Sequence, residues 1–424
     1  MKIDEYRKKG LNFAFGREGF RDGTYYLETP SSKEDARRKG AVLTGVLKKL
    51  KAGEANISLE KLPVKFRQSF LEGCLLADYS FSKYKKERDK EAVLYVKGAK
   101  GVPEAERIRD VVFFVRDIVN DAPDKVNPEG FSKIATSFKK VKVFVGDEGW
   151  LRENGFYGTL TVGRGSSVPP RVVIFRYKPE GARKKIVLVG KGVTFDSGGL
   201  DLKPPKYMKG MHMDMSGAAA VLGVARAVEA GFKFNAEIVG IMPLAENLPS
   251  ATSYKPADVI EMANGKTVEV ENTDAEGRLL LADALIYAEK ENADVVIDLA
   301  TLTGAAVVGL GELVAAMYSR DDGEADKMER ASSETGELVW RMPLLKEYKE
   351  DLKSKRADIK NADYGRSGGS IMAALFLGEF INKDKWIHLD IAGPAMLSKS
   401  FYYMPEGGTG FGVRLLIQYL RGEK

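Results

Sequence analysis

The arrangement of apolar segments constrains the fold of this 424-residue chain more than any other feature of its sequence. Runs rich in Val, Ile and Leu predict strands at RVVIFRY (171–177), KIVLVG (185–190), AEIVGIM (236–242), DVVIDLA (294–300) and WIHLD (386–390). Helical periodicity lies between and after them, at 216–231, 279–291, 371–381 and 413–420. Strands without a polar face must be covered on both sides, which favours a mixed, mostly parallel sheet covered by helices.

The residues before this pattern predict a smaller domain. An amphipathic helix over 31–51 and a short strand over 91–98 indicate an N-terminal α/β domain at residues 1–102. Residues 103–123 predict a connecting helix, because a proline suits its start and another lies at its far end. Residues 124–424 then form the larger C-terminal domain, so we expect a two-domain α/β protein.

Cysteine usage and hydropathy limit where the protein works. The single cysteine, Cys74, lies in the apolar helical pattern LEGCLLADY (71–79) and predicts a core thiol without a disulfide partner. The opening MKIDEYRKKG lacks the apolar segment that a secretory signal needs. The longest apolar runs fall short of the roughly 18 residues of a membrane span. We therefore expect a cytoplasmic protein that does not enter a membrane.

Charge is unevenly distributed along the chain. Residues 1–100 carry 23 Lys and Arg against 14 Asp and Glu, whereas the whole chain carries 66 against 60. A basic region can meet an acidic partner such as nucleic acid. Here acids are mixed with the bases, and no aromatic stacking motif is interleaved with them. We favour a solvated surface and expect no nucleic-acid partner.

The strand ends indicate where a site would lie, because ligands bind at the carboxyl ends of the strands in open α/β sheets. After the strand 185–190, the segment GKGVTFDSGGLDLKPP (190–205) places Lys191, Asp196 and Lys203 in a glycine-rich turn. It lacks the GK[ST] of a Walker phosphate-binding loop. Two interpretations stay open: Asp196 forms the turn with both lysines in water, or the three charged side chains share a site.

A second candidate segment is MHMDMSGAAAVLG (211–223), which places Asp214 directly before a helix of small residues. The simpler interpretation of Asp214 is a helix cap.

The segment NTDAEGRLLLADAL (272–285) contains Asp274, Glu276 and Arg278 at intervals of two. In an extended stretch, all three side chains would emerge on one face before the helix begins. The alternative is a capping box formed by Thr273 and Glu276, with Arg278 in solvent.

Caps alone do not explain why four acids and two lysines gather beside predicted strand ends. Carboxylates bind hard or borderline divalent cations, and two cations about 3.5–4 Å apart need bridging acids to offset their repulsion. The four acids would balance two dications, which leaves Lys203 and Arg278 as positive charge facing a substrate. If Lys191 is itself a ligand, it must be neutral, which an adjacent dication can support. The four acids are Asp196, Asp214, Asp274 and Glu276.

The two histidines narrow the chemistry further. His388 lies in the strand pattern WIHLD and is interpreted as a packed structural residue. His212 lies between two methionines, which favours a pocket wall over a metal ligand. A Ser-His-Asp triad is not expected, because the chain has no G-x-S-x-G elbow.

The string NTDAEGRL (272–279) is the one by which the leucyl aminopeptidase family, the M17 or cytosol aminopeptidases, is identified, and the chain resembles this family on that specific match. The resemblance covers most of residues 120–424, whereas the first third matches mainly at EGCLLADYSFSKYK (72–85). Further matching strings are GKGVTFDSGG, MHMDMSGAAAVLG, ENLPSATSYKPADVI, LATLTGA, GGSIMAALFLGEF, HLDIAGPA and GTGFGVRLL.

The resemblance implies a catalytic domain with two divalent metal ions per subunit, Zn or Mn first and Co or Mg next. It implies that Asp196 and Glu276 bridge both ions. Lys191 and Asp214 would complete the tighter site, and Asp274 the more exchangeable one.

The resemblance also implies that Lys203 holds the scissile carbonyl oxygen, while Arg278 positions a bicarbonate ion as general base. Met211, Thr301 and Leu302 would lie near the side-chain pocket. The implied activity is hydrolysis of N-terminal peptide bonds, preferably after apolar residues such as leucine. The implied assembly is a homohexamer.

Two departures from the family pattern are Ser216, where relatives commonly have Gly, and His212, where a basic residue is common. Neither removes a ligand. Two alternatives stay open at this point: a two-metal phosphoesterase that uses the same acids, and a DNA-binding role of the basic N-terminal region.

Overall fold

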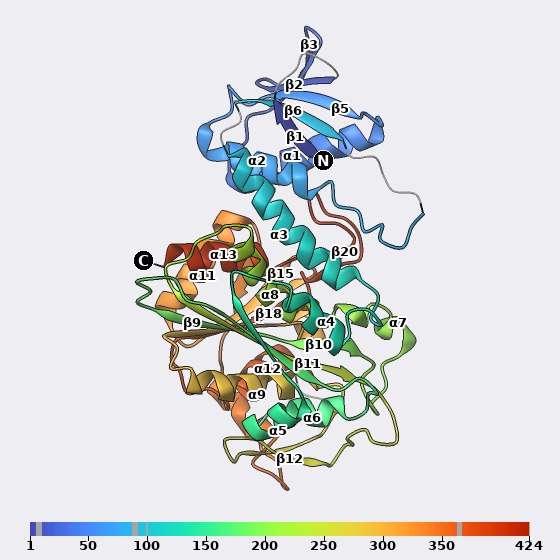
Figure 1. Ribbon diagram of the computed structural model, residues 1–424, viewed down its shortest axis with the longest axis vertical. Helices are drawn as coiled ribbons and strands as arrows, with labels where there is room; N and C mark the ends of the chain where they lie inside the picture. The colour runs from blue at the N-terminus through green and yellow to red at the C-terminus, as the bar shows by residue number, and fades with distance from the viewer. Residues whose placement is uncertain (6–10, 87–91, 99–100, 363–366, 424) are drawn as a thin grey trace. The chain divides into compact units, whose positions relative to one another are not determined.

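The computed structural model describes residues 1–5, 11–86, 92–98, 101–362 and 367–423, which form two compact units (Figure 1). The first unit comprises Met1–Phe113, Glu334–Gly336 and Leu397–Thr409. The second comprises Phe114–Ser333, Glu337–Met396 and Gly410–Lys424. Helix α3 (Val102–Asn120) runs from one unit into the other, at the place where the sequence predicts a connecting helix.

The first unit contains a six-stranded sheet in the order β1-β6-β5-β2-β4-β3. Neighbouring strands are parallel except for β3 and β4. Its strands are β1 (Lys2–Glu5), β2 (Leu11–Phe15), β3 (Gly19–Arg21), β4 (Thr24–Leu27), β5 (Glu54–Ser58) and β6 (Val93–Lys97), and its first two helices are α1 (Lys33–Lys49) and α2 (Val64–Leu76).

Helices α1 and α2 approach each other closely because each has a glycine at the contact. A Cβ added to Gly40 would collide with the Phe70 carbonyl, and one added to Gly73 would collide with the Arg37 carbonyl. The helices and the sheet enclose one apolar core. Cys74 is fully buried in that core, which confirms the predicted core thiol.

The second unit contains a nine-stranded sheet in the order β16-β15-β18-β14-β9-β11-β8-β7, with β10 paired to β11. Five neighbouring pairs are parallel and three antiparallel. This confirms a mixed, mostly parallel sheet. The strands are β7 (Lys142–Gly146), β8 (Arg171–Tyr177), β9 (Lys185–Gly190), β10 (Gly192–Asp196), β11 (Glu237–Asn247), β14 (Val295–Ala300), β15 (Val314–Ser319), β16 (Leu338–Arg341) and β18 (Trp386–Asp390).

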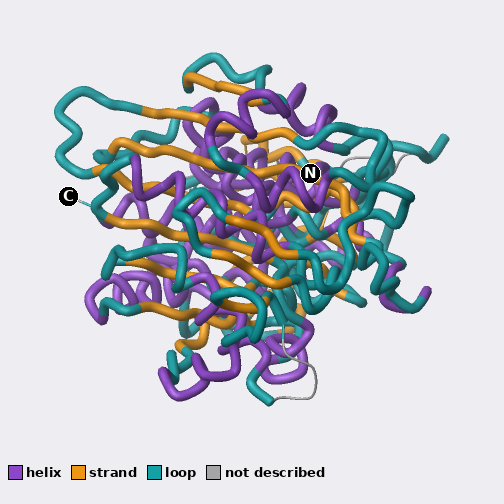
Figure 2. Tube along the Cα trace, turned by 90° about the horizontal axis from the view of Figure 1, so that it is seen from below, coloured by secondary structure: helices purple, strands orange, loops and turns teal. Residues whose placement is uncertain are grey.

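Helices cover both faces of this sheet, with α8 and α13 on one side and α9 and α12 on the other (Figure 1). Figure 2 shows strands running side by side with helices packed against them. The helices are α4 (Pro128–Ala135), α5 (Glu148–Asn154), α6 (Tyr157–Gly163), α7 (Pro205–Met208), α8 (Ser216–Glu229), α9 (Gly277–Lys290), α10 (Gly304–Leu310), α11 (Asp322–Thr335), α12 (Gly369–Leu377) and α13 (Val413–Gly422), with 3₁₀ turns η1 (Met211–Met213) and η2 (Lys346–Leu352).

Short strands complete the structure. Strands β12 (Val259–Glu261), β13 (Thr267–Glu269) and β17 (Ile359–Lys360) form a three-stranded sheet, and β19 (Met396–Leu397) pairs with β20 (Gly407–Gly408). Over the part of the chain that the structure describes, no helix combines the length and the apolar character of a membrane span.

Two strands differ from the sequence prediction. The strand expected at 236–242 continues to Asn247, because its far half pairs with β10, in a register from Gly192 opposite Leu244 to Asp196 opposite Asn247. Strand β10 itself was expected to be a turn. The longer β11 matters for function, because it carries Asn247 to the strand ends where the site lies.

His388 has the structural role that the sequence predicts. It lies in β18 with no exposed surface, and its Nδ1 is 2.5 Å from Asp298 Oδ1. The ring stacks with Tyr318 and with Trp386, whose ring centroids lie 5.8 and 6.4 Å away.

Candidate functional site

The charged residues singled out in the sequence converge at the carboxyl ends of central strands. Lys191 directly follows β9, Asp196 ends β10, and Asp214 lies between η1 and α8. The turn 272–276 leads into α9. We call the following six residues the acid–lysine cluster: Lys191, Asp196, Lys203, Asp214, Asp274 and Glu276.

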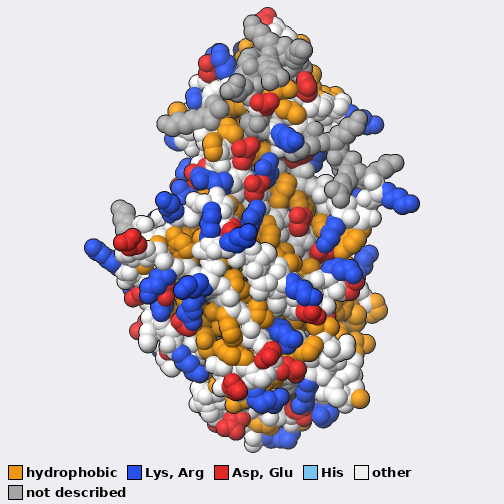
Figure 3. Space-filling view, viewed as in Figure 1, with side chains coloured by type: hydrophobic (Ala, Val, Ile, Leu, Met, Phe, Trp, Pro, Cys, Tyr) orange, Lys and Arg blue, Asp and Glu red, His pale blue; other side chains and the backbone are white. Residues whose placement is uncertain are grey.

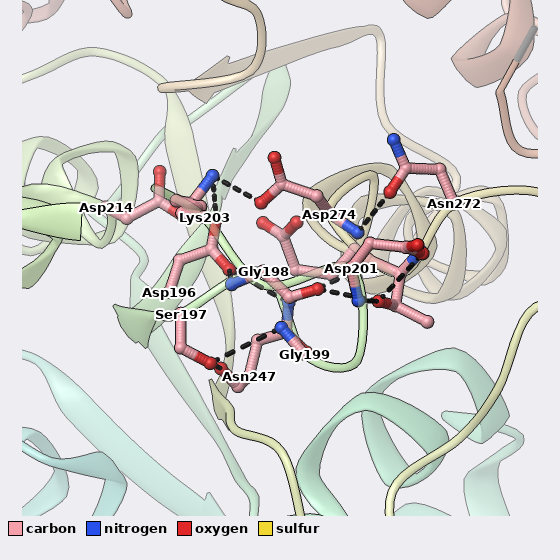
Figure 4. Close-up of polar contacts among 12 residues, drawn as sticks. Asp196, Ser197, Gly198, Gly199, Asp201, Lys203, Asp214, Asn247, Asn272 and Asp274 are labelled. Carbon is pink, nitrogen blue, oxygen red and sulfur yellow. Dashed lines mark hydrogen bonds and ion pairs between the residues drawn. The ribbon is translucent and has the colours of Figure 1, made fainter. Parts of the chain in front are cut away.

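One half of the cluster is an acidic triad around Lys203. Asp196, Asp274 and Glu276 each place one carboxylate oxygen within 4.8 Å of the other two. The ammonium of Lys203 lies 2.9 Å from Asp196 Oδ2 and pairs with Asp274 as well. Figure 4 shows Lys203 reaching between these two aspartates.

The other half surrounds Lys191. Its Nζ lies 2.8 Å from Asp214 Oδ2 and 2.9 Å from Glu276 Oε1. It also donates a hydrogen bond of 2.8 Å to the carbonyl of Thr301. Glu276 thus links the two halves, and the structure brings together all six residues of the cluster. Lys191 and the three acids Asp196, Asp214 and Glu276 are each at most 3% exposed.

Electrostatics in the cluster reflect four acids sharing two lysines. Burial raises the pKa of Asp274 to about 7, and the negative charges of Asp196 and Glu276 add to the effect. Burial opposes the charged form of Glu276, but Lys191 and Lys203 outweigh it and lower the Glu276 pKa. With all six groups ionised, the cluster would carry two uncompensated negative charges in a buried place.

The donor set fits divalent metal ions. Asp214 Oδ2, Asp274 Oδ1 and Glu276 Oε1 are buried, and none of the described residues donates a hydrogen bond of suitable geometry to them, although lysines lie close enough for ion pairs. Buried carboxylate oxygens are normally satisfied by hydrogen bonds or cations. Converging carboxylate oxygens with a shortage of positive charge are the ligands that hard and borderline dications prefer.

Two glycines make room for the cluster. Gly198 has φ +89°, which L side chains rarely adopt, and a Cβ there would lie 3.0 Å from Asp274 Oδ1. A Cβ at Gly277 would lie 2.6 Å from Lys191 Nζ and collide with the neighbouring methylene. Glycine at these positions therefore lets Asp274 and Lys191 enter the site.

Asn247, which the sequence analysis missed, orients Asp196. Its Nδ2 donates to Asp196 Oδ1 at 2.8 Å and to the Thr273 carbonyl at 3.0 Å, and the side chain is fully buried. The Gly198 N–H donates to the same Oδ1 at 2.9 Å. The protein thus holds Oδ1, and Oδ2 faces Lys203. A signal was present, because Asn247 follows a predicted strand in a segment where ligands are expected.

The capping interpretations were wrong. The Thr273 hydroxyl does not cap α9. It donates to the Gly198 carbonyl at 2.6 Å, and the Thr273 N–H donates to Asp201 Oδ2 at 2.7 Å. Asp214 does not cap α8 either, since Met215 is the N-cap residue and Asp214 Oδ1 accepts from the Thr301 hydroxyl at 2.6 Å. These side chains serve tertiary contacts instead.

The expected extended stretch from Asp274 to Arg278 was also wrong. Glu276 has helical φ/ψ of −77° and −38°, and α9 begins at Gly277, so Arg278 lies inside the helix. A distant residue fixes the preceding turn: Asn361 Oδ1 accepts from the Glu271 N–H at 2.8 Å. Its Nδ2 donates to the Asn272 carbonyl at 2.7 Å.

Arg278 is buried in the first turn of α9, two residues after Glu276. Its Nη1 donates to the Asn361 carbonyl, and its guanidinium lies 5.7 Å from the centre of the Phe376 ring. Burial lowers the pKa of Arg278 to about 10, although the charges of Glu276 and Asp390 oppose the shift. Arg278 therefore stays charged at neutral pH, and its Nε finds no acceptor among the described residues.

Thr301, one of the predicted pocket residues, contacts the cluster directly through Lys191 and Asp214. Met211 and Leu302 are half-buried. His212 lies outside the acidic group able to hold a metal that is found among the described residues. Ser216, one of the two departures from the expected family pattern, donates its hydroxyl to the Met213 carbonyl. It therefore does not occupy the Asp214 carboxylate.

Comparison with known proteins gives a consistent result. A family model described as "Cytosol aminopeptidase family, catalytic domain" matches residues 113–417. The "Probable cytosol aminopeptidase" of Persephonella marina is 40% identical over 413 residues, which cover 92% of this chain and 82% of the relative. The protein of the same description from Aquifex aeolicus is 42% identical over 367 residues, covering 83% and 74%.

Solved structures agree with the sequence comparison. The "Bottromycin maturation enzyme BotP in complex with Mn" superimposes with a TM-score of 0.90 at 32% identity, covering 97% of this chain and 99% of that one. A second BotP structure has a TM-score of 0.89, with the same identity and coverage. The likeness extends over both units.

Proposed function

The chain belongs to the cytosol aminopeptidase family, and we propose that it uses two divalent cations to remove N-terminal residues, preferably apolar ones such as leucine. The observation that carries the proposal is the acid–lysine cluster. Three of its carboxylates converge within 4.8 Å, and its four acids share only the two lysines Lys191 and Lys203. A cap or a structural ion pair would leave no such shortage of positive charge.

The arrangement suggests which residues hold which cation. Asp196 and Glu276 would hold both cations, as the family resemblance implies, and Glu276 belongs to both halves of the cluster. Lys191 and Asp214 would complete one site, with Lys191 neutral, and Asp274 the other. We propose Zn or Mn first and Co or Mg next, since all four metals accept carboxylate oxygens. Two such cations polarise a carbonyl and lower the pKa of a water molecule held there.

Lys203 has the environment that a carbonyl-binding cation needs. Burial opposes its charge, but the neighbouring Asp196, Glu276 and Asp274 outweigh that effect and raise its pKa above the usual value. The ammonium therefore keeps its proton. Its side chain is 14% exposed, so a substrate can reach it. Lys203 would donate to the scissile carbonyl oxygen as negative charge develops there.

Arg278 would hold a bicarbonate ion that takes up a proton from the attacking water. The proposal is supported by the permanent charge of Arg278 and by its buried Nε, which has no acceptor among the described residues. The guanidinium fork suits a planar oxyanion. A neutral or acidic side chain at position 278 would not bind bicarbonate.

The pocket for the N-terminal side chain would be formed by Met211, Thr301 and Leu302. Two of these are apolar and half-buried, which favours apolar substrate residues. Such a pocket gives moderate selectivity, because one methylene contributes only about 1–3 kcal/mol. The free amine of a peptide would bind beside Asp214, which restricts cleavage to chain ends.

We further propose that the protein works in the cytoplasm as a homohexamer. The second unit exposes apolar side chains, including Val308 at 91% and Trp340 at 64%, which an assembly would bury. We propose no nucleic-acid partner. On the face that Figure 3 shows, basic and acidic side chains are interspersed.

The test compares Glu276→Ala with Glu261→Ala, an exposed acid on β12, by elemental analysis and by hydrolysis of aminoacyl amides with added Mn²⁺ or Zn²⁺. We expect Glu276→Ala to lose metal and at least about 100-fold of its leucyl-amide turnover, while Glu261→Ala matches wild type. Near wild-type turnover of Glu276→Ala would contradict the bridging role. Faster turnover of phosphate esters than of aminoacyl amides would indicate a phosphoesterase instead.

A further inference from the structure

A buried carboxylate that belongs to no part of the acid–lysine cluster lies at the end of β18. Asp390 is 1% exposed and lies opposite Ala300 of β14 in the sheet register. Its Oδ2 accepts a hydrogen bond of 2.6 Å from the Thr303 hydroxyl. Its Oδ1 accepts from the Leu302 N–H at 3.1 Å and, more weakly, from the Thr303 N–H at 3.4 Å. One carboxylate thus holds the segment that follows β14.

The same segment contacts the metal-binding residues through Thr301. The Thr301 carbonyl accepts from Lys191 Nζ at 2.8 Å, and its hydroxyl donates to Asp214 Oδ1 at 2.6 Å. A shift of residues 302–303 would therefore turn both Thr301 groups away from Lys191 and Asp214. Strand pairing holds the backbone before Thr301, where the Ala300 carbonyl accepts from the Ile391 N–H at 2.8 Å, and Asp390 holds the backbone after it. Thr301 is joined to the residues that Asp390 holds by a single peptide bond.

Asp390 is itself held firmly. Its Oδ1 also accepts from the Ala392 N–H at 3.2 Å, and Oδ2 lies 3.4 Å from the Ser370 hydroxyl. The Ser370 hydroxyl in turn lies 2.8 Å from the Tyr318 hydroxyl. Because β18 and α12 both support the carboxylate, it cannot follow a displaced loop. A fixed acceptor of this kind orients the residues that hydrogen-bond to it.

We infer that Asp390 is a positioning residue of the metal site, acting through residues 301–303 to orient Lys191 and Asp214. The inference rests on the proposed metal-dependent function. The inference predicts that Asp390 affects metal affinity indirectly. Among the described residues, Asp390 makes no hydrogen bond to the acid–lysine cluster.

The chain offers a closely matched control. Asp283 in α9 is also 1% exposed, and it accepts from the Gly158 N–H, the Thr159 N–H and the Thr159 hydroxyl. Each acid therefore accepts from two consecutive backbone N–H groups and from one threonine hydroxyl. Asp283 holds the start of α6 in this way, and Asp390 holds the start of α10. Only the segment held by Asp390 leads to the cluster.

The test is calorimetric titration of the metal-free full-length protein with Mn²⁺. We expect Asp390→Asn to bind Mn²⁺ about tenfold more weakly than wild type, and Asp283→Asn to bind like wild type. Equal affinity of Asp390→Asn and wild type would overturn the inference. An equal loss in both variants would overturn it as well, because the effect would then follow from weakened folding. Absence of Mn²⁺ binding by wild type would instead refute the proposed function.

A second pair of variants keeps the inference testable if Asp390→Asn does not fold. Thr303→Val removes the shortest hydrogen bond to Asp390 and the cap that the same hydroxyl gives to α10, whereas Thr303→Ser keeps the hydroxyl. We expect several-fold weaker Mn²⁺ binding by Thr303→Val and rescue by Thr303→Ser. Equal affinities of the two variants would overturn the inference.

Discussion

Replacing Asn247 by Asp tests whether the orientation of Asp196 depends on a single amide. The exchange keeps the volume and puts an oxygen where Nδ2 now lies, 2.8 Å from Asp196 Oδ1 and 3.0 Å from the Thr273 carbonyl. The hydrogen bond to the charged acceptor is worth about 1.5–3 kcal/mol, and the one to the carbonyl about 0.5–1.5 kcal/mol. We expect the free energy of unfolding of the metal-free protein to fall by about 2–4 kcal/mol.

The same change should weaken Mn²⁺ binding by about 10–100-fold, because Asp196 loses one of the two donors that hold Oδ1. Urea unfolding and calorimetric titration measure the two effects. Asn56→Asp is the control, since Asn56 is equally buried but lies on β5 in the first unit. It should lower stability and leave Mn²⁺ affinity unchanged. If folded Asn247→Asp bound Mn²⁺ as tightly as wild type, Asn247 would not orient the bridging carboxylate.

Three further predictions concern Lys203, Gly40 and Asp283. Lys203→Met should lower leucyl-amide turnover by about 100-fold or more with metal content intact, and loss of metal in elemental analysis would mean that Lys203 has another role. Gly40→Ala should lower stability to urea by about 1–3 kcal/mol, because its Cβ meets backbone of α2; Gly45→Ala, with nothing within 4 Å, should not. Burial raises the folded pKa of Asp283 to about 7, against about 3.9 unfolded, so its contribution to stability is lost as pH rises through about 4 to 7. The stability of Asp283→Asn relative to wild type should therefore increase as the pH rises through that range. Urea unfolding at several pH values measures this, and an equal pH dependence of the free energy of unfolding in both proteins would refute it.

Local pattern predicted several elements of the second unit correctly. Strands β8, β9, β14 and β18 lie where unbroken apolar runs predicted them. Such runs are informative because a strand buried on both faces is composed largely of apolar residues. The buried polar residues in these strands are hydrogen-bonded, as Asp298 and His388 are to each other. Strand β10 was missed, because its residues include Gly192, Thr194 and Asp196 and carry no apolar run. Its pairing with β11 defines it as a strand.

For the candidate site, the sequence identified the residues but not the conformation of the segments that carry them. The acids and lysines were recognisable from their chemistry and from their places after strands, and six of them meet in the structure. The local conformation of their segments was not recognisable. The Thr273 hydroxyl and the Asp214 carboxylate, both assigned to caps, bond to Gly198 and Thr301 instead.

The sequence by itself determined the alternation of strands and helices, the sheet type and the kinds of donor atom available, because these depend on residue chemistry and on periodicity over a few residues. Only the tertiary structure decided that α9 begins at Gly277, that Asn247 holds one oxygen of Asp196, and that Asp390 holds the loop carrying Thr301. Each of these depends on a hydrogen bond between residues far apart in the chain. A local pattern carries no information about such a partner, since the energy that selects it arises only when the strands are assembled.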